Sequence, residues 1–256
     1  MEQETALTIT ALTTGYADKK LACGISAELH GGELTVMLGV NGVGKSTLLR
    51  TITGFQPMIS GDVLIGGRRL GDYSQLELSR QVGVVLTHRP ALNDISVREL
   101  VAMGRTPHTG FWGRNSIEDE RTVDEAIDMV RIGSYSKRMV NTLSDGEFQK
   151  AMIAKAIAQQ TPVMVLDEPT AFLDFPSKVE LMQTLRRIAR EKGVAVLVST
   201  HDVELALHFA DKVWVLNKDS LLSGSPRDIA LEGGLDIFFT SDSIVFDREM
   251  MSYRMK

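Results

Sequence analysis

The chain has 256 residues, 43% of them hydrophobic and 24% charged, and its formal net charge is -5 at pH 7. This composition is that of a globular protein with a full core, and the acidic balance argues against a nucleic-acid partner. No apolar run approaches the roughly 18 residues that cross a bilayer, and no signal-peptide pattern opens the chain. We therefore expect a cytosolic protein that reaches any membrane through a partner.

Strand-like alternation dominates the N-terminal third of the chain. The single Cys23 lies in one of these runs, where we expect a small core residue rather than a reactive thiol. Gly54 suits the position just after a helix end. The expected elements are, in chain order, strands at 6–16, 20–29 and 33–39, a helix at 47–55, a strand pair within 61–70 and a strand at 81–86.

Helical periodicity begins near residue 95, and alternation returns in the final third. In the middle block we expect helices at 96–105, 116–135 and 147–160. In the final third we expect strands at 163–167, 195–201 and 212–217 and helices at 177–193 and 202–210. Strands that alternate with helices of this length predict a mostly parallel sheet covered on both faces, with the helical block inserted into it.

A phosphate-binding pattern follows the strand at 33–39. The letters GVNGVGKST fit G-x-x-x-x-G-K-[ST] between a strand and a helix, which is the context that makes this motif credible. Glycines let backbone N–H groups face phosphates, Lys45 reaches the β and γ phosphates, and the Ser46 hydroxyl is offered to Mg²⁺. The predicted site consists of Gly39, Asn41, Gly42, Val43, Gly44, Lys45, Ser46 and Thr47.

A pair of acids follows the apolar strand in PVMVLDEPT. Phosphoryl transfer needs one carboxylate for the metal shell and another group that positions the attacking water. Because a buried strand fixes where its end emerges, we expect Asp167 to hold Mg²⁺ and Glu168 to act on the water.

These motifs, with LSDGEFQK at 143–150 and LVSTHD around His201, resemble the ATP-binding subunit of ABC transporters in order and spacing. The resemblance implies an α/β fold: a P-loop NTPase (RecA-like) core with an N-terminal antiparallel β subdomain and an inserted ABC α-helical subdomain. The expected division is a core with β subdomain at 1–92 and 161–230, a helical subdomain at 93–160 and a short tail at 231–256. We expect the tail to be a frayed end or a small packing element.

The resemblance also implies that two copies face head to tail, with each ATP between the phosphate loop of one copy and Ser144 and Gly146 of the other. Tyr16 matches the aromatic residue that stacks on adenine, and Asp174 matches an acid in a loop that crosses the dimer interface. His201 matches the switch histidine that contacts the γ-phosphate and the catalytic water. Activity is expected to be hydrolysis of ATP with Mg²⁺.

Two positions depart from the family pattern. His88 stands where the family has a glutamine that touches Mg²⁺ and senses the membrane subunit, and imidazole is a poor substitute for an amide oxygen on this hard cation. Either His88 acts through water, or the loop is shifted and Thr87 supplies the oxygen. We expect His88 to couple the site to the partner but to bind metal weakly. Asp145 stands where the family usually has glycine. Asp tolerates positive φ and favours helix starts, so the backbone can stay unchanged. Its charge near a triphosphate should weaken the ATP-driven closure of the dimer. Glu147, in contrast, can point away from the nucleotide.

The stretch ISVRELVAMGRTPH resembles ATPases of iron-siderophore, haem and cobalamin importers. That resemblance implies a homodimer on the cytoplasmic face of the inner membrane, bound to polytopic permease subunits and coupled indirectly to a periplasmic or lipoprotein substrate-binding protein. A soluble ATPase of iron-sulfur cluster assembly and an exporter ATPase remain as alternatives. A related DNA-repair ATPase would need a long coiled-coil insertion, which the sequence lacks.

Overall fold

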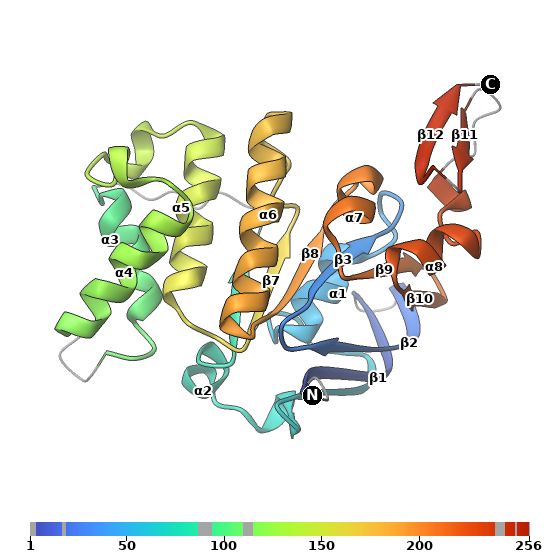
Figure 1. Ribbon diagram of the computed structural model, residues 1–256. Coiled ribbons are helices and arrows are strands. Elements are labelled where there is room, and N and C mark those ends of the chain that lie inside the picture. Colours follow the sequence, from blue (N-terminus) through green and yellow to red (C-terminus); the bar gives the residue numbers. More distant parts are fainter. Residues whose placement is uncertain are drawn as a thin grey trace.

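The computed structural model describes residues 4–16, 19–86, 94–109, 115–238, 244–248 and 250–255. Within these residues the chain forms a six-stranded sheet, a four-stranded sheet, a terminal two-stranded hairpin and a block of helices (Figure 1). None of the helices in these ranges has the length and apolarity that a bilayer crossing demands.

The six-stranded sheet is parallel except at one edge, where β10 runs antiparallel to β9. Across the sheet its strands are β10 (Ser220–Gly224), β9 (Lys212–Asn217), β3 (Leu34–Leu38), β8 (Ala195–Ser199), β7 (Val163–Asp167) and β6 (Val82–Val85). The mostly parallel sheet is confirmed, although the sequence pattern did not reveal β10. Because parallel strands end at one edge, the loops after β3, β7 and β8 gather there.

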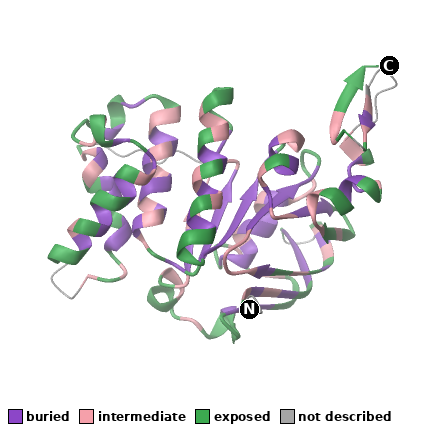
Figure 2. Ribbon diagram, viewed as in Figure 1, coloured by how far each residue is buried: buried purple, intermediate pink, exposed green. Residues whose placement is uncertain are grey.

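Helices cover both faces of this sheet, as the sequence predicted. Val163 and Val165 of β7 point to the side of α1 (Lys45–Ile52), whereas Met164 and Leu166 point to the side of α6 (Phe175–Lys192) and α7 (Val203–Phe209). Both sets of side chains are buried, and the three central strands β3, β8 and β7 are purple in Figure 2. The buried sheet therefore holds its C-terminal edge rigidly.

An antiparallel sheet packs over α1, and its strands are β2 (Lys19–His30), β1 (Thr5–Tyr16), β4 (Ser60–Ile65) and β5 (Arg68–Arg69). The N-terminal antiparallel sheet and the expected strand pair are confirmed. Cys23 is only half-buried and lies outside the core. The prediction of a core residue is wrong because Ala22 and Ile25 take the core-facing positions, on either side of Gly24 with φ +64°.

The helical block consists of α3 (Val97–Ala102), α4 (Ile117–Met129) and α5 (Asp145–Ala158). Ser96, Ser116 and Ser144 each begin a helix with a reciprocal capping box, which satisfies N–H groups that lack an intrahelical acceptor. Two helices are shorter than predicted. The segment 96–105 continues after α3 as a 3-10 turn at Met103–Arg105, and α4 stops before Arg131, whose φ is +58°.

Shorter elements complete the described chain. They are α2 (Gln75–Ser79), α8 (Pro226–Leu231), β11 (Ile244–Asp247), β12 (Ser252–Met255) and 3-10 segments at Leu70–Asp72, Gly133–Tyr135, Val140–Thr142 and Asp236–Phe238. β11 and β12 pair antiparallel, with Ile244 opposite Met255 at one end and Asp247 opposite Ser252 at the other. Within the described residues the tail thus holds an ordered hairpin whose Phe246 packs into the main core, so of the two expectations the small packing element fits and the frayed end does not.

Candidate functional site

The predicted phosphate loop joins β3 to α1 and requires glycine at two positions. Gly44 caps the helix with φ 110° and ψ 14°, a conformation that side chains disfavour. A Cβ on Gly39 would lie 2.9 Å from Cγ1 of Val43 and 3.0 Å from the Leu216 carbonyl oxygen. The tight turn places the first N–H groups of α1, together with its dipole, at the open edge of the sheet, where an anion binds favourably.

Lys45 begins α1 and is 5% exposed. Its Nζ donates a hydrogen bond to the Gly39 carbonyl oxygen over 2.8 Å and lies 3.4 Å from Nδ1 of His201. Burial lowers the pKa of Lys45, and the nearby carboxylates of Glu168 and Asp167 oppose that shift. A buried cation held above this loop suits the recognition of a phosphate group.

Tyr16 ends β1 beside the same loop. Its ring is half-exposed, at 51%, and its hydroxyl accepts a hydrogen bond from Oγ1 of Thr47 over 3.5 Å. The structure therefore brings Tyr16 to the end of the phosphate loop, as the predicted adenine-stacking role requires.

The two acids at the end of β7 are held by a residue that sequence reasoning missed. The hydroxyl of Ser199, at the end of β8, donates to Oδ1 of Asp167 over 2.7 Å and accepts from the N–H of Glu168 over 2.9 Å. Asp167 is buried, and Glu168 has a φ of +50° in the left-handed region. Such strain in a residue other than glycine persists where surrounding contacts fix it, and it is concentrated at functional sites. The only sequence signal for Ser199 was its place two residues before His201.

His201 follows β8 and contacts both sides of the predicted site. Its Nε2 bonds to Oε1 of Glu168, while Nδ1 faces the Lys45 ammonium. Since an ammonium only donates and a carboxylate only accepts, both contacts are satisfied by the neutral imidazole that carries its proton on Nε2. The structure thus brings together Lys45, Glu168 and His201, which were predicted from three separate motifs.

A cavity of about 230 Å³ connects these groups. Its lining consists of Leu21, Asn41, Gly42, Gly44, Lys45, Ser46, Thr47, Glu168 and His201. The predicted metal ligands, Ser46 and Asp167, offer oxygen atoms, which Mg²⁺ prefers, and it is commonly held by one or two carboxylates together with substrate phosphates. The donor set present therefore fits Mg²⁺.

The loop LSDGEFQK forms the start of α5. The Ser144 side chain accepts from the Glu147 N–H over 3.3 Å, and the Glu147 carboxylate accepts from the Ser144 N–H over 2.9 Å. Glu147 also pairs with Arg138 over 2.8 Å, and the N–H of Ser144 and this guanidinium both lower its pKa. Glu147 is therefore part of the helix cap. Ser144 itself remains exposed.

Asp145 is the first residue of α5 and has no positive φ. Of the two conformations left open by the sequence, the helical one is adopted, because a carboxylate in the first helical turn is favoured by the helix dipole. Gly146 sits close to the following loop, since a Cβ there would lie 3.1 Å from Cδ2 of Leu173.

Asp174 caps α6 by accepting the Ser177 N–H over 3.2 Å, and hydrogen bonds from the Ser177 side chain and from this N–H lower its pKa. It shares a cavity of about 490 Å³ with Ser144 and Gly146. Among the described residues, this cavity and the one at the phosphate loop have no lining residue in common. The predicted nucleotide ligands therefore fall into two separate groups on one chain.

His88 and Thr87 lie outside the described residues, so the predictions about them stay predictions. Gly104 and Arg105 of the importer-like stretch ISVRELVAMGRTPH have a structural explanation. A Cβ on Gly104 would lie 2.3 Å from the Lys155 carbonyl oxygen. The Arg105 side chain is buried and donates to Asp119 over 2.8 Å and to the Ala158 carbonyl oxygen over 2.8 Å.

Comparisons with known proteins extend over most of the chain. The model of one family, described as ABC transporter, matches residues 23–171. The ferric enterobactin transport ATP-binding protein FepC of Escherichia coli is 36% identical over 219 residues, covering 85% of this chain and 81% of that protein. The achromobactin transport ATP-binding protein CbrD of Dickeya dadantii is 33% identical over 239 residues, covering 93% of this chain and 89% of that protein.

A solved structure is also similar. The structure of cbiO1 from Clostridium perfringens, part of the ABC transporter complex cbiONQ, superposes with a TM-score of 0.78 at 28% identity and covers 92% of this chain and 96% of that one.

Proposed function

This chain belongs to the ABC transporter family as an ATP-binding subunit with ATPase activity, and from this premise we propose that it powers an importer of iron-siderophore chelates. The observation that carries the proposal is the similarity, over 85% and 93% of the chain, to relatives named for ferric enterobactin and achromobactin transport. Haem and cobalamin, the other chelates of the predicted subfamily, are the nearest alternative substrates.

We further propose that ATP is hydrolysed between two copies arranged head to tail. The support is the division of the predicted ligands into two cavities, one with Lys45 and Ser46 and the other with Ser144 and Gly146. Because these groups line different cavities of one chain, a single copy offers each nucleotide only half a site. A second copy that brings the start of its α5 to the phosphate loop completes the site, since a helix N-terminus attracts anions.

In this arrangement the N–H groups at the start of α1 and the Lys45 ammonium bind the β and γ phosphates, and Tyr16 stacks on the base. Ser46 and Asp167 would hold Mg²⁺, which when bound neutralises negative charge on the phosphate oxygens. Ser199 fixes the rotamer of Asp167 and the backbone of Glu168 through its two hydrogen bonds. These groups position the triphosphate rather than react with it.

Glu168 is proposed as the base that accepts a proton from the attacking water. Its carboxylate is held by Nε2 of His201, and its backbone is held by Ser199. His201 thereby orients Glu168 and lies between it and Lys45. Positioned proton transfer of this kind contributes about 10² to 10⁴ to a rate.

The proposed location is the cytoplasmic face of the inner membrane, where the protein binds peripherally to polytopic permease subunits. These in turn receive the chelate from a periplasmic or lipoprotein binding protein.

The test is purification of the tagged full chain from detergent-solubilised membranes, followed by reconstitution of the complex in vesicles. We expect a polytopic protein to co-purify and ATP to drive an iron-siderophore in the import direction. Recovery of a soluble scaffold in place of a membrane protein would reassign the chain to iron-sulfur cluster assembly, and outward transport would make it an exporter ATPase.

A further inference from the structure

The chain ends in a hairpin that extends beyond the main body of the molecule, at the upper right of Figure 1. β11 and β12 pair only with each other within the described residues. A two-stranded hairpin is marginally stable in water unless it packs against something else. Phe246 supplies this packing by joining the main core, whereas Tyr253 is 53% exposed and Met255 is 87% exposed. The hairpin therefore presents apolar surface of the kind that marks an interaction site.

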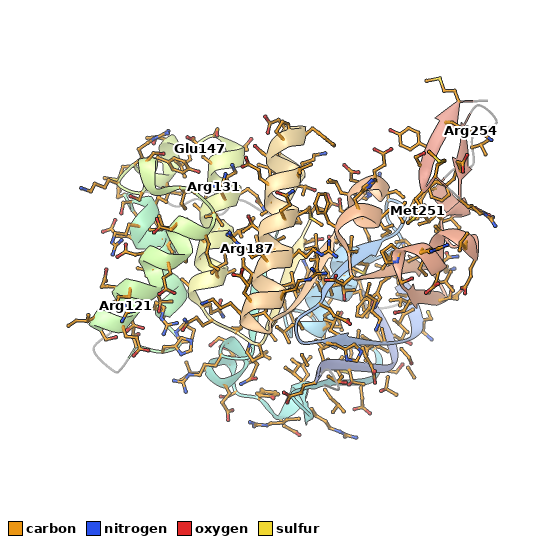
Figure 3. The ribbon with its side chains drawn as sticks, viewed as in Figure 1. Arg121, Arg131, Glu147, Arg187, Met251 and Arg254 are labelled. Carbon is orange, nitrogen blue, oxygen red and sulfur yellow. The ribbon has the colours of Figure 1, made fainter. Side chains whose placement is uncertain are left out.

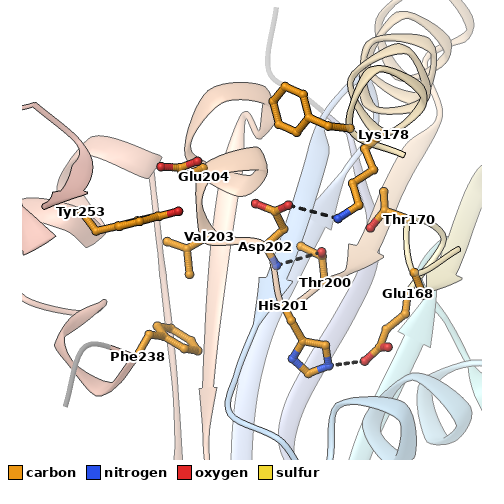
Figure 4. A pocket seen from close by; sticks show the side chains of 12 residues that line it. Glu168, Thr170, Lys178, Thr200, His201, Asp202, Val203, Glu204, Phe238 and Tyr253 are labelled. Carbon is orange, nitrogen blue, oxygen red and sulfur yellow. Dashed lines mark hydrogen bonds and ion pairs between the residues drawn. The ribbon is translucent and has the colours of Figure 1, made fainter. Parts of the chain in front are cut away.

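A cavity of about 660 Å³ lies between this hairpin and the core, and Phe175, Phe238 and Tyr253 contribute aromatic rings to its lining. Glu168 and His201 line the same cavity (Figure 4). Phe175, at the start of α6, is itself 66% exposed. The aromatic surface is thus continuous with the catalytic residues.

The hairpin also stands at the edge of the molecule that carries the nucleotide groups. Figure 3 places Glu147, at the start of α5, and Arg254, on β12, on the same upper side. The start of α6 lies between them (Figure 1). A second copy that approaches this edge to complete the ATP site therefore meets the hairpin of the first copy.

We propose that the hairpin and the aromatic side chains Phe175, Phe238 and Tyr253 form a second contact with the other copy of this chain, separate from the ATP ligands. This inference rests on the head-to-tail dimer of the proposed function. Continuity of the aromatic surface with Glu168 and His201 identifies the other copy as the occupant, because that copy faces these residues. None of these three side chains lines the cavities of the predicted nucleotide ligands, so we expect two copies to associate before ATP binds.

The experiment measures the dimer dissociation constant of the purified full chain without nucleotide, by sedimentation equilibrium. The test variant is Tyr253→Ser combined with Met255→Ser. The matched control is Ile117→Ser, which removes an 85% exposed apolar side chain from α4 in the helical block. Because both test positions are exposed, circular dichroism should show the fold of the parent in all three proteins.

We expect the parent to form a dimer without nucleotide, the control to match it, and the test variant to raise the dissociation constant by about tenfold or more, as truncation of interface aromatics does. A parent that is monomeric without nucleotide, or a test variant equal to the control, would overturn the inference.

A second arm separates this inference from the proposed function. Each variant is combined with Glu168→Gln, which should trap ATP, and measured with ATP. If ATP-dependent dimers form while the nucleotide-free contact is absent, the hairpin contact fails and the ATP dimer stands. If the test variant combined with Glu168→Gln stays monomeric with ATP, the head-to-tail site fails.

Discussion

The hydroxyl of Ser199 lies 2.7 Å from Oδ1 of Asp167, and this hydrogen bond joins the ends of two neighbouring parallel strands. Ser199 is fully buried and Asp167 is 3% exposed, so water does not readily replace either partner. The same hydroxyl accepts the N–H of Glu168. One serine therefore holds both acids of the proposed site.

We predict that Ser199→Ala lowers the free energy of unfolding by about 1–3 kcal/mol, because the partly buried N–H of Glu168 and a buried carboxylate oxygen of Asp167 each lose a partner. It should also raise the Mg²⁺ concentration for half-maximal ATPase activity by about tenfold, the usual cost of losing a group that orients a metal ligand. Ser223→Ala, on exposed β10, is the control. An unchanged Mg²⁺ dependence would remove Ser199 from this positioning role.

The Glu168→Gln variant should lose turnover by a factor of about 10² to 10⁴, because the amide cannot accept the proton of the water. ATP binding should persist, since the amide oxygen can still accept from Nε2 of His201. Steady-state ATPase assays and equilibrium ATP binding measure the two effects. Glu204→Gln is the matched control, because Glu204 lines the adjacent cavity, whereas the carboxylate that bonds to Nε2 of His201 is that of Glu168. Turnover within about tenfold of the parent would exclude Glu168 as the base.

The sequence predicted most of the fold because its strands are strongly apolar and its motifs follow those strands directly. The strands at 163–167 and 212–217 were predicted with the observed limits. The end of α4 was not, because Arg131 in the left-handed region stops the helix and arginine gives no signal of that conformation. The hairpin was also missed, since its mixture of methionine and charge lacks clear alternation.

In the site, residues from contiguous motifs were predicted, whereas those that act across the fold were not. Lys45, Glu168 and His201 each lie at a strand or helix boundary that the sequence marks. Ser199 pairs with Asp167 only because β7 and β8 are neighbours in the sheet, which local periodicity does not reveal. The pairing of Arg138 with Glu147 likewise depends on how the segment before α5 folds back.

Replacement of Tyr16 tests the proposed base contact. Tyr16→Ala should weaken ATP binding by about 1–3 kcal/mol, the usual contribution of stacking on one base, which is about fivefold to 150-fold in Kd. Tyr16→Phe keeps the ring and loses only the 3.5 Å contact with Thr47, so it should bind like the parent. Isothermal titration with ATP and with inorganic tripolyphosphate separates base from phosphate recognition. Equal losses for both ligands would contradict stacking.

The buried pair of Arg105 and Asp119 should make the free energy of unfolding depend on pH in the acidic range. Hydrogen bonds from the N–H and hydroxyl of Ser116, with the Arg105 guanidinium, lower the pKa of Asp119 from 3.8 to about 2. A depressed pKa adds stability that is present above 3.8 and is lost as the pH falls toward about 2. At neutral pH, Asp119→Asn should cost about 3–5 kcal/mol because it leaves the arginine buried without its counterion.

The cost of Asp119→Asn should therefore shrink as the pH falls through this window, as measured by urea unfolding of parent and variant. Glu118→Gln, at the neighbouring exposed position, should differ little from the parent at every pH. A cost that does not change with pH would show that packing, rather than the charge of Asp119, accounts for the loss.

Asp145 places a carboxylate at the start of the helix that is proposed to meet the partner's triphosphate. Asp145→Asn removes the charge and keeps the shape, so in the Glu168→Gln background it should tighten the ATP-dependent dimer on the order of tenfold at low salt, through about 1–2 kcal/mol of relieved repulsion. Asp145→Gly should also tighten the dimer. It should make the monomer less stable than the parent, because the helix start loses a favourable carboxylate. Sedimentation at low and high salt measures both effects, and the gain should fade at high salt as the charges are screened. An unchanged or looser dimer with Asp145→Asn would mean that this carboxylate serves the loop, and that the threshold for closure is set by other residues.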